Sequence, residues 1–222
     1  MMEESICLSP RLQTVADMIP SCDTVVDVGS DHGKLGACCL LEDRCRFVIA
    51  TDIHALPAER TRERLKGFKD RCDVKVTDGL SGVELKEDMT VVIAGMGGLE
   101  ISKILKNALS AEKGIPRGMG FVLQPQKSYY ELRSFLSENG FSISEERIAR
   151  ERDRFFYIVI FAEYTGEAYD LTEEEKYLGP VILKNRPENY VEYIAHEEKL
   201  FSKRALGDQK CAQILKNWEK YL

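Results

Sequence analysis

Two acids and two glycines alternate from the end of an apolar run near the start of the chain. The run spans residues 24–28, and the alternating residues are Asp27, Gly29, Asp31 and Gly33. This pattern predicts the first strand of a parallel sheet, followed by a sharp turn into a helix. Glycine allows the backbone to pass close to a ligand, whereas carboxylates at such a turn would repel a pyrophosphate. The acids therefore favour a neutral or cationic ligand over a dinucleotide.

Similar residues follow three later apolar runs, each expected to be a strand. Asp52 closes the second run, Asp78 and Gly79 close the third, and a Gly-Met-Gly-Gly stretch at 95–98 closes the fourth. Ligands of a doubly wound sheet bind at the carboxyl ends of its strands. Asp52 follows Gly29 by 23 residues, close to the ~20 expected of an acid that binds ribose hydroxyls. We therefore expect S-adenosylmethionine (SAM), which carries a sulfonium and an ammonium group, rather than NAD.

Each strand end also has a plainer interpretation as a capped turn, because aspartate and glycine are common in turns. Four such ends in register favour a ligand site. We expect Asp52 to bind the ribose, Asp78 to bind the adenine amino group, and Gly29 with its neighbours to line the methionine end. The predicted cofactor site comprises Asp27, Gly29, Ser30, His32, Asp52, Ile53, Asp78, Gly79, Ala94, Gly95 and Met96.

Strand-like and helix-like stretches alternate through most of the chain, which predicts a doubly wound α/β sheet. The expected strands are 24–28, 47–51, 74–76, 89–94, 120–123, 141–150 and 155–164, and the expected helices between and before them are 8–19, 35–41, 58–68, 100–109 and 129–139. The last two strands follow each other directly, so they should form an antiparallel hairpin at one edge.

The character of the chain changes near residue 166. Apolar residues between Tyr190 and Trp218 fall at roughly heptad intervals in a highly charged background. This spacing is typical of a helical hairpin or a short coiled coil. We expect a SAM-binding Rossmann-like domain over 1–165 and a helical, coiled-coil-like domain over 166–222. The helical part could be a packing appendage, or an arm that holds RNA or another partner.

Composition limits the class of protein. The net charge is -6 and the isoelectric point is near 5.3, which argues against a wholly basic nucleic-acid binder. A local basic face would still suffice for RNA. The acidic start of the chain is unlike a signal peptide, and apolar runs fall short of the ~20 residues of a membrane span, so a cytoplasmic protein is expected. Seven cysteines without a C-x-x-C pair indicate reduced, structural thiols and no metal site.

Four motifs resemble those of the bacterial tRNA (adenine(22)-N1)-methyltransferase family. They are Leu-Ser-Pro-Arg-Leu at 8–12, Asp-Val-Gly-Ser-Asp-His at 27–32, Ile-Ala-Gly-Met-Gly-Gly at 93–98 and Leu-Gln-Pro at 123–125. The resemblance implies a SAM-dependent methyltransferase that modifies N1 of adenine 22 in tRNA. This chain departs from the family at three places, which affect the detail of the pocket and the entry of the base. They are Gly-Lys-Leu-Gly at 33–36 for the usual Ala-Tyr-Leu-Pro, Asp52 for a common Glu, and Gln126 for Asn.

The substrate side of this predicted site centres on Asp31. A carboxylate near N6 of the adenine would stabilise the positive charge that N1 methylation creates, although Asp31 could instead cap the next helix. Arg11, Gly97 and Gln124 are assigned to the RNA, and Arg11 could bind a phosphate or stack on a base. Other possible phosphate contacts are Lys34, Lys127, Arg133, Arg147, Arg150, Arg152 and Arg154.

Two alternative functions remain compatible with the residues. The first is a SAM-dependent methyltransferase of a small molecule or protein, which the acidic charge would suit better. The second is a non-catalytic SAM- or nucleoside-binding module whose helical tail recruits a partner. We expect a monomer, although no motif tests the oligomeric state.

Overall fold

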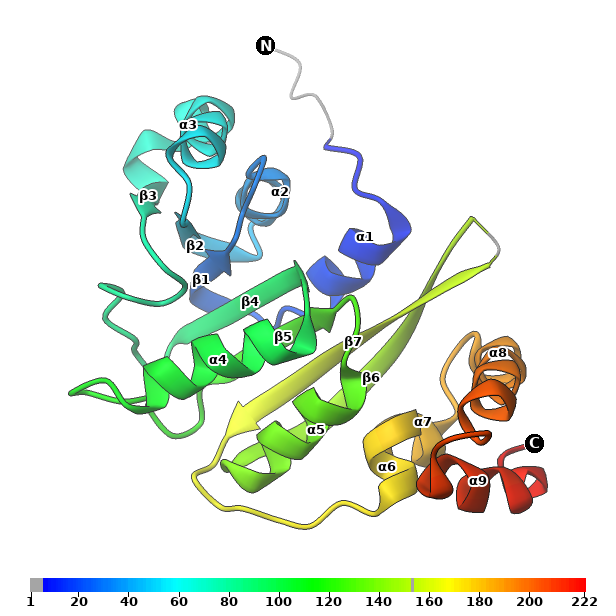
Figure 1. The fold of residues 1–222 in the computed structure, drawn as a ribbon. Coiled ribbons are helices and arrows are strands. Elements are labelled where there is room, and N and C mark those ends of the chain that lie inside the picture. Colours follow the sequence, from blue (N-terminus) through cyan, green and yellow to red (C-terminus); the bar gives the residue numbers. More distant parts are fainter. Residues whose placement is uncertain (1–5, 153) are drawn as a thin grey trace.

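A single mixed sheet forms the centre of the protein. The computed structural model describes residues 6–152 and 154–222. Its strands are β1 (Cys22–Val28), β2 (Cys45–Asp52), β3 (Cys72–Val76), β4 (Met89–Met96), β5 (Gly120–Pro125), β6 (Phe141–Glu151) and β7 (Phe155–Tyr164). They lie in the order β3-β2-β1-β4-β5-β7-β6, as Figure 1 shows. Strands β1 to β5 are parallel and β7 is antiparallel to both β5 and β6. The predicted doubly wound α/β fold and its antiparallel edge hairpin are confirmed.

Helices connect the strands and then continue beyond them. They are α1 (Pro10–Asp17), α2 (Lys34–Leu41), α3 (Ala55–Arg64), α4 (Gly98–Leu109), α5 (Tyr129–Glu138), α6 (Glu173–Leu178), α7 (Pro180–Asn185), α8 (Tyr190–Arg204) and α9 (Gln209–Lys216), with 3₁₀ helices at Leu65–Arg71 and Trp218–Tyr221. Ser9 caps α1 as the Ser-Pro pair predicts, because its hydroxyl accepts the N–H of Leu12. Within the described residues, no helix is both long enough and apolar enough to cross a membrane.

Neighbouring residues of the central strands pack on opposite faces of the sheet. Val26 of β1 lies in a core with side chains of α4 and α5, whereas Val25 lies in a core with side chains of α1 and α2. Val91 and Val92 of β4 are divided in the same way. The two-residue period of a strand explains this division. Since helices cover both faces (Figure 1), the loops at the strand ends are the natural place for a site.

A buried ion pair joins the C-terminal helices to the sheet. Arg133 Nε of α5 donates to Glu146 Oε1 of β6 over 2.8 Å, and both side chains are fully buried. Glu146 Oε2 also accepts the backbone N–H groups of Val181 and Ile182 at the start of α7, over 2.9 and 3.2 Å. Arg133 Nη1 donates to the carbonyl of Tyr177 near the end of α6 over 2.9 Å. The two charges therefore fix α6 and α7 against α5 and β6.

Gly179, between α6 and α7, allows these groups to come together. Its φ is +103°, and a Cβ at this position would lie 2.6 Å from Glu146 Oε2 and 2.8 Å from Arg133 Nη2. The prediction that Arg133 contacts phosphate is wrong, because its guanidinium is buried in this cluster. The sequence suggested an exposed cation because arginines on helices usually face solvent.

We expect Glu146→Ala to destabilise the protein strongly. The substitution leaves the Arg133 guanidinium buried without its counter-charge, which costs ~3–5 kcal/mol. Urea unfolding followed by circular dichroism measures the change. The matched control is Glu84→Ala, which breaks the exposed ion pair with Lys113 and should leave the midpoint unchanged. Equal shifts in the two variants would show that the buried pair has no special role.

Candidate cofactor and substrate site

A cavity of about 420 Å³ lies at the carboxyl ends of β1 and β4. It brings together many of the residues predicted from the sequence, from three segments of the chain. The predicted residues that line it are Arg11, Asp27, Gly29, Ser30, Asp31, His32, Ala94, Gly95 and Met96. Leu12, Leu35, Lys34 and Gln126 line it as well. The two leucines were missed, because nothing distinguishes them in the sequence from core leucines.

The turns after β1 and β4 meet at Gly29. Its backbone has φ +72°, and a Cβ there would lie only 2.2 Å from Cε of Met96. The Gly29 N–H donates to the carbonyl of Thr51 at the end of β2 over 2.8 Å. The left-handed backbone therefore favours glycine, and a Cβ here would also force the end of the Met96 side chain to move.

Asp27 supplies buried negative charge below this turn. Burial raises the pKa of its carboxyl to about 7, the nearby Asp52 carboxylate acts in the same direction, and the backbone N–H of Gly36 opposes them. Burial and the neighbouring Asp52 thus disfavour the charged form of Asp27 in the absence of a counter-charge. A perturbed acid in a cleft indicates function, and a cationic ligand would relieve the repulsion.

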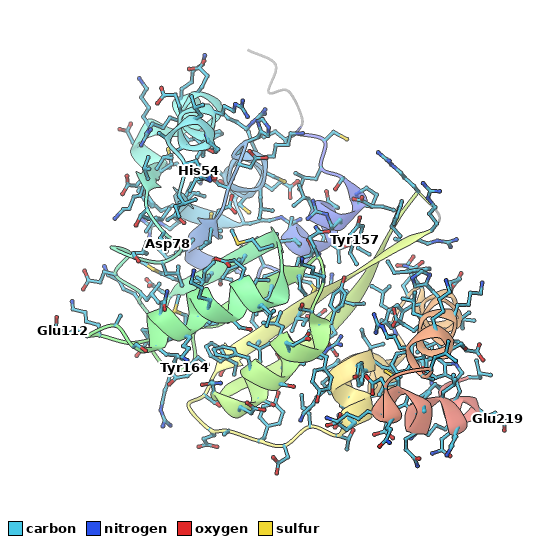
Figure 2. The ribbon with its side chains drawn as sticks, in the orientation of Figure 1. His54, Asp78, Glu112, Tyr157, Tyr164 and Glu219 are labelled. Carbon is cyan, nitrogen blue, oxygen red and sulfur yellow. The ribbon has the colours of Figure 1, made fainter. Side chains whose placement is uncertain are left out.

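The other four predicted cofactor residues lie next to the cavity rather than in its lining. Asp52 Oδ1 accepts the N–H of His54 over 2.9 Å, and the Asp52 carbonyl accepts the N–H of Thr77 over 2.9 Å. Thr51 Oγ1 donates to the carbonyl of Gly79 over 2.9 Å. These bonds hold the loop with Asp78 against the end of β2. Figure 2 labels His54, which follows β2, and Asp78, which follows β3.

Ile53 and Asp78 are both exposed along this loop edge, and Ile53 exposes 58% of its surface. A nucleoside that extended from the cavity past Asp52 would therefore meet an apolar side chain and a carboxylate. This order agrees with the ribose and adenine contacts expected from the sequence, and the assignment of those contacts stays a prediction.

Gln124 is a buried connector behind the cavity. Its Oε1 accepts from Arg11 Nη1 over 2.6 Å, from the Gly95 N–H over 3.1 Å and from Gln126 Nε2 over 3.3 Å. Its Nε2 donates to the carbonyl of Pro125 over 2.7 Å. Gln124 is fully buried and lies outside the cavity lining. The expected contact with RNA therefore has no exposed surface to use, and the side chain instead positions Arg11 and the Gly95 turn.

A bulge ends β4 beside the cavity. The pairing with β5 shifts register between Ala94 and Met96, and Gly95 has φ +83°. Bulges of this kind redirect a chain next to active sites. Gly97 then caps α4, and it too lies outside the cavity lining. A Cβ on Gly98 would lie 2.3 Å from the carbonyl oxygen of Ser128. Helix α4 can therefore start this close to the loop after β5 only because residue 98 is a glycine.

Asp31 and His32 form the rim of the cavity. Asp31 has φ +46°, a left-handed conformation that aspartate adopts more readily than most residues other than glycine. Its side chain is 66% exposed, and Oδ2 lies 3.7 Å from His32 Nε2. The hydroxyl of the buried Thr61 donates to the Asp31 carbonyl over 3.2 Å and is paired with Ser30 Oγ over 3.1 Å. Thr61 was missed because it lies within a run of charged helical residues.

The alternative role of Asp31 as a helix cap is wrong. The N-cap position of α2 is Gly33, which has φ +62° and supplies no side-chain cap. The Asp31 carboxylate is therefore not committed to the helix, and it lies where a ligand in the cavity could reach it.

The described residues contain no group of three or more His, Cys, Asp or Glu side chains arranged to bind a metal ion. Their cysteines are free thiols. Burial raises the pKa of the Cys38 thiol to about 11, which keeps it protonated and unreactive. The polar side chains that line the cavity are those of Arg11, Asp27, Ser30, Asp31, His32, Lys34 and Gln126.

Comparison with known proteins places this chain among methyltransferases. A family model described as a methyltransferase domain matches residues 8–160. A Mycoplasma pneumoniae protein whose name suggests a tRNA methyltransferase is 31% identical over 211 residues, 92% of this chain and 95% of the relative. The tRNA (adenine(22)-N(1))-methyltransferase of Bacillus subtilis is 32% identical over 156 residues, 69% of this chain and 64% of the relative. The structure of M. capricolum TrmK with S-adenosyl-homocysteine is similar in fold, with a TM-score of 0.76, 23% identity and 96% coverage of each chain.

We expect Gly29→Ala to abolish SAM binding while the protein stays folded. The new methyl group would collide with Met96 and strain the turn. Gly82→Ala is a matched control, because Gly82 has nearly the same φ, +71°, but open space around its Cβ position. Calorimetric titration with SAM should show binding to the control and none to Gly29→Ala. Equal affinities would contradict a cofactor site at this turn.

Proposed function

Because this chain belongs to the tRNA (adenine(22)-N1)-methyltransferase family, we propose that it transfers a methyl group from SAM to N1 of adenine 22 in tRNA. The observation that carries the proposal is the buried Asp27 in the lining of the cavity at the carboxyl ends of β1 and β4. A buried Asp27 with a raised pKa beside Asp52 suits a cationic cofactor and disfavours a pyrophosphate.

The cofactor would lie along the strand ends from the cavity toward the β2–β3 edge. Asp27 and the backbone at Gly29 face its methionine end, Asp52 accepts from the ribose hydroxyls, and Asp78 accepts from the adenine amino group. When bound, SAM supplies an electrophilic methyl group on its sulfonium. The narrow contact between Gly29 and Met96 restricts how deeply this end can enter.

The target adenine needs alignment rather than a strong base. Its N1 carries an in-plane lone pair, so the nitrogen can attack once it is held behind the methyl group. The N1–methyl bond forms as the methyl–sulfur bond breaks, and the sulfur keeps the electron pair. The ring becomes cationic and N6 later loses a proton. The exposed carboxylate of Asp31 accepts from N6 and stabilises this charge.

Arg11 and Met96 position the base. Arg11 is held by Gln124 and by Glu151 Oε1, which accepts its backbone N–H over 3.2 Å. Its guanidinium can therefore contact the base or an adjoining phosphate from a defined direction. Met96 lies between the two turns and offers an apolar floor for the ring. The Watson–Crick edge carries N1, so the adenine must be unpaired or extruded before it reacts.

We also propose how the chain is organised around this reaction. Residues 1–165 carry the catalytic cavity and 166–222 form a helical domain that packs on it through the Arg133–Glu146 pair. We propose that the acting unit is a monomer. A tRNA substrate implies a cytoplasmic location.

The function is tested by incubating the protein with methyl-labelled SAM and a tRNA transcript, followed by nucleoside mapping. We expect label in 1-methyladenosine at position 22 and none in a transcript with guanosine at that position. Label in small metabolites or protein would favour the alternative methyltransferase, and SAM binding without transfer would favour a binding module. Either result would contradict the proposal.

Asp31→Asn should retain SAM binding and lower kcat roughly 10²-fold, because it removes the charge that stabilises the methylated ring. Asp43→Asn is the control, since Asp43 is also exposed with a positive φ, +50°, but lies outside the cavity lining. Single-turnover kinetics with tRNA, together with SAM titration, separates the two effects. An unchanged kcat would exclude a catalytic role for the carboxylate.

A further inference from the structure

A second and larger cavity lies beside the cofactor cavity. Its volume is about 1010 Å³, more than twice that of the cofactor cavity. Side chains of α5, β7, α6 and α8 line it, and aromatic rings are prominent among them. We call it the aromatic groove and define it by Tyr130, Phe155, Phe156, Tyr157 and Tyr177.

The groove forms because the β6–β7 hairpin extends past the end of the neighbouring strand β5. Pairing between β5 and β7 stops at Leu123 with Ile160, whereas β6 and β7 stay paired as far as Glu151 with Phe155. The hairpin therefore projects past the end of β5, as Figure 1 shows. Since β7 is antiparallel to β5, Phe155 and Tyr157 lie at the end of the sheet where the cofactor cavity opens. Helix α8 bounds the other side.

The two cavities share a wall. Gln126 lines both of them. Arg11 lines the cofactor cavity, and its guanidinium carbon lies 5.7 Å from the ring centroid of Tyr157, which lines the groove. A polymer with one unit at the cofactor would therefore present its adjoining unit to the groove.

The groove offers flat surfaces to a planar ligand. Phe155 is 42% exposed, and the guanidinium carbon of Arg154 lies 4.9 Å from its ring centroid. Lys210 Nζ lies 5.5 Å from the ring centroid of Tyr130. Unpaired bases stack on aromatic rings and on arginine planes, and cations beside the rings suit the phosphates that flank a base.

The acids that line the groove favour a base over a phosphate as its ligand. Glu131, Glu197 and Asp208 are part of the lining. Burial raises the pKa of the Glu197 carboxyl to about 7, although Arg204 and Arg133 oppose this shift. Carboxylates repel phosphate but accept hydrogen bonds from the amino groups of bases.

We propose that the aromatic groove binds an unpaired nucleobase that neighbours the target adenine in the RNA. This inference rests on the proposed function and names the part of the substrate that the second cavity recognises. Extruding the adenine costs stacking energy, and its neighbour loses a stacking partner at the same time. Stacking that neighbour in the groove replaces the lost contact and helps to hold the adenine at the cofactor.

The test uses tRNA transcripts with 2-aminopurine at the position before or after the target adenine. Binding of the unaltered protein should change the fluorescence at one of the two positions. Phe155→Ala should abolish that change and raise the KM for tRNA about tenfold, with SAM affinity unchanged. Phe155→Trp should preserve both the change and the KM, because it keeps an aromatic face.

The matched control is Leu206→Ala, which removes an apolar side chain that is 91% exposed and lies outside the groove lining. It should behave as the unaltered protein. If the protein methylates tRNA but Phe155→Ala leaves KM and fluorescence unchanged, the groove does not hold a base. The inference is then overturned, while the proposed function stands. If the unaltered protein methylates no tRNA, the proposed function and the inference are both overturned.

Discussion

The hydrogen bonds to one oxygen of Gln124 connect the parts of the candidate site. This buried oxygen accepts from α1 through Arg11, from the bulge after β4 through Gly95, and from the loop after β5 through Gln126. The first two line the cofactor cavity, and the third lines both cavities. Because all three donors converge on one acceptor, their relative positions are set before any ligand arrives. Such preorganisation is what methyl transfer needs, since alignment supplies most of its acceleration.

Electrostatics explains how an acidic protein can act on RNA. In the proposed function, the buried acids Asp27 and Asp52 face the cationic cofactor, so part of the net charge of -6 lies away from the RNA phosphates. In the same proposal, RNA would be recognised by local features, namely the Arg11 guanidinium, the cations near the hairpin and the aromatic faces of the groove. A base can stack on those faces without any excess of positive charge.

Local patterns were sufficient to predict the sheet, its edge hairpin and the residues at the strand ends. Strand periodicity and the repeated Asp and Gly residues are readable over a few positions, and parallel strands bring their ends together by necessity. The role of Gln124 could not be predicted in this way, because Arg11 lies 113 residues before it. Arg133 looked like a surface cation for the same reason, since Glu146 and the start of α7 meet it only in the folded chain. The aromatic groove depends on the different lengths of β5 and β7, and on helices from the end of the sequence.

The most direct test of the cofactor site is a crystal structure of the protein with S-adenosyl-homocysteine. The amino-acid end of the ligand should lie against Gly29 and Asp27, with both ribose hydroxyls within hydrogen-bond distance of the Asp52 carboxylate. The sulfur should then face the rim at Asp31. A ligand bound in the aromatic groove, or one whose ribose lies away from Asp52, would contradict a SAM site at the carboxyl ends of β1, β2 and β4.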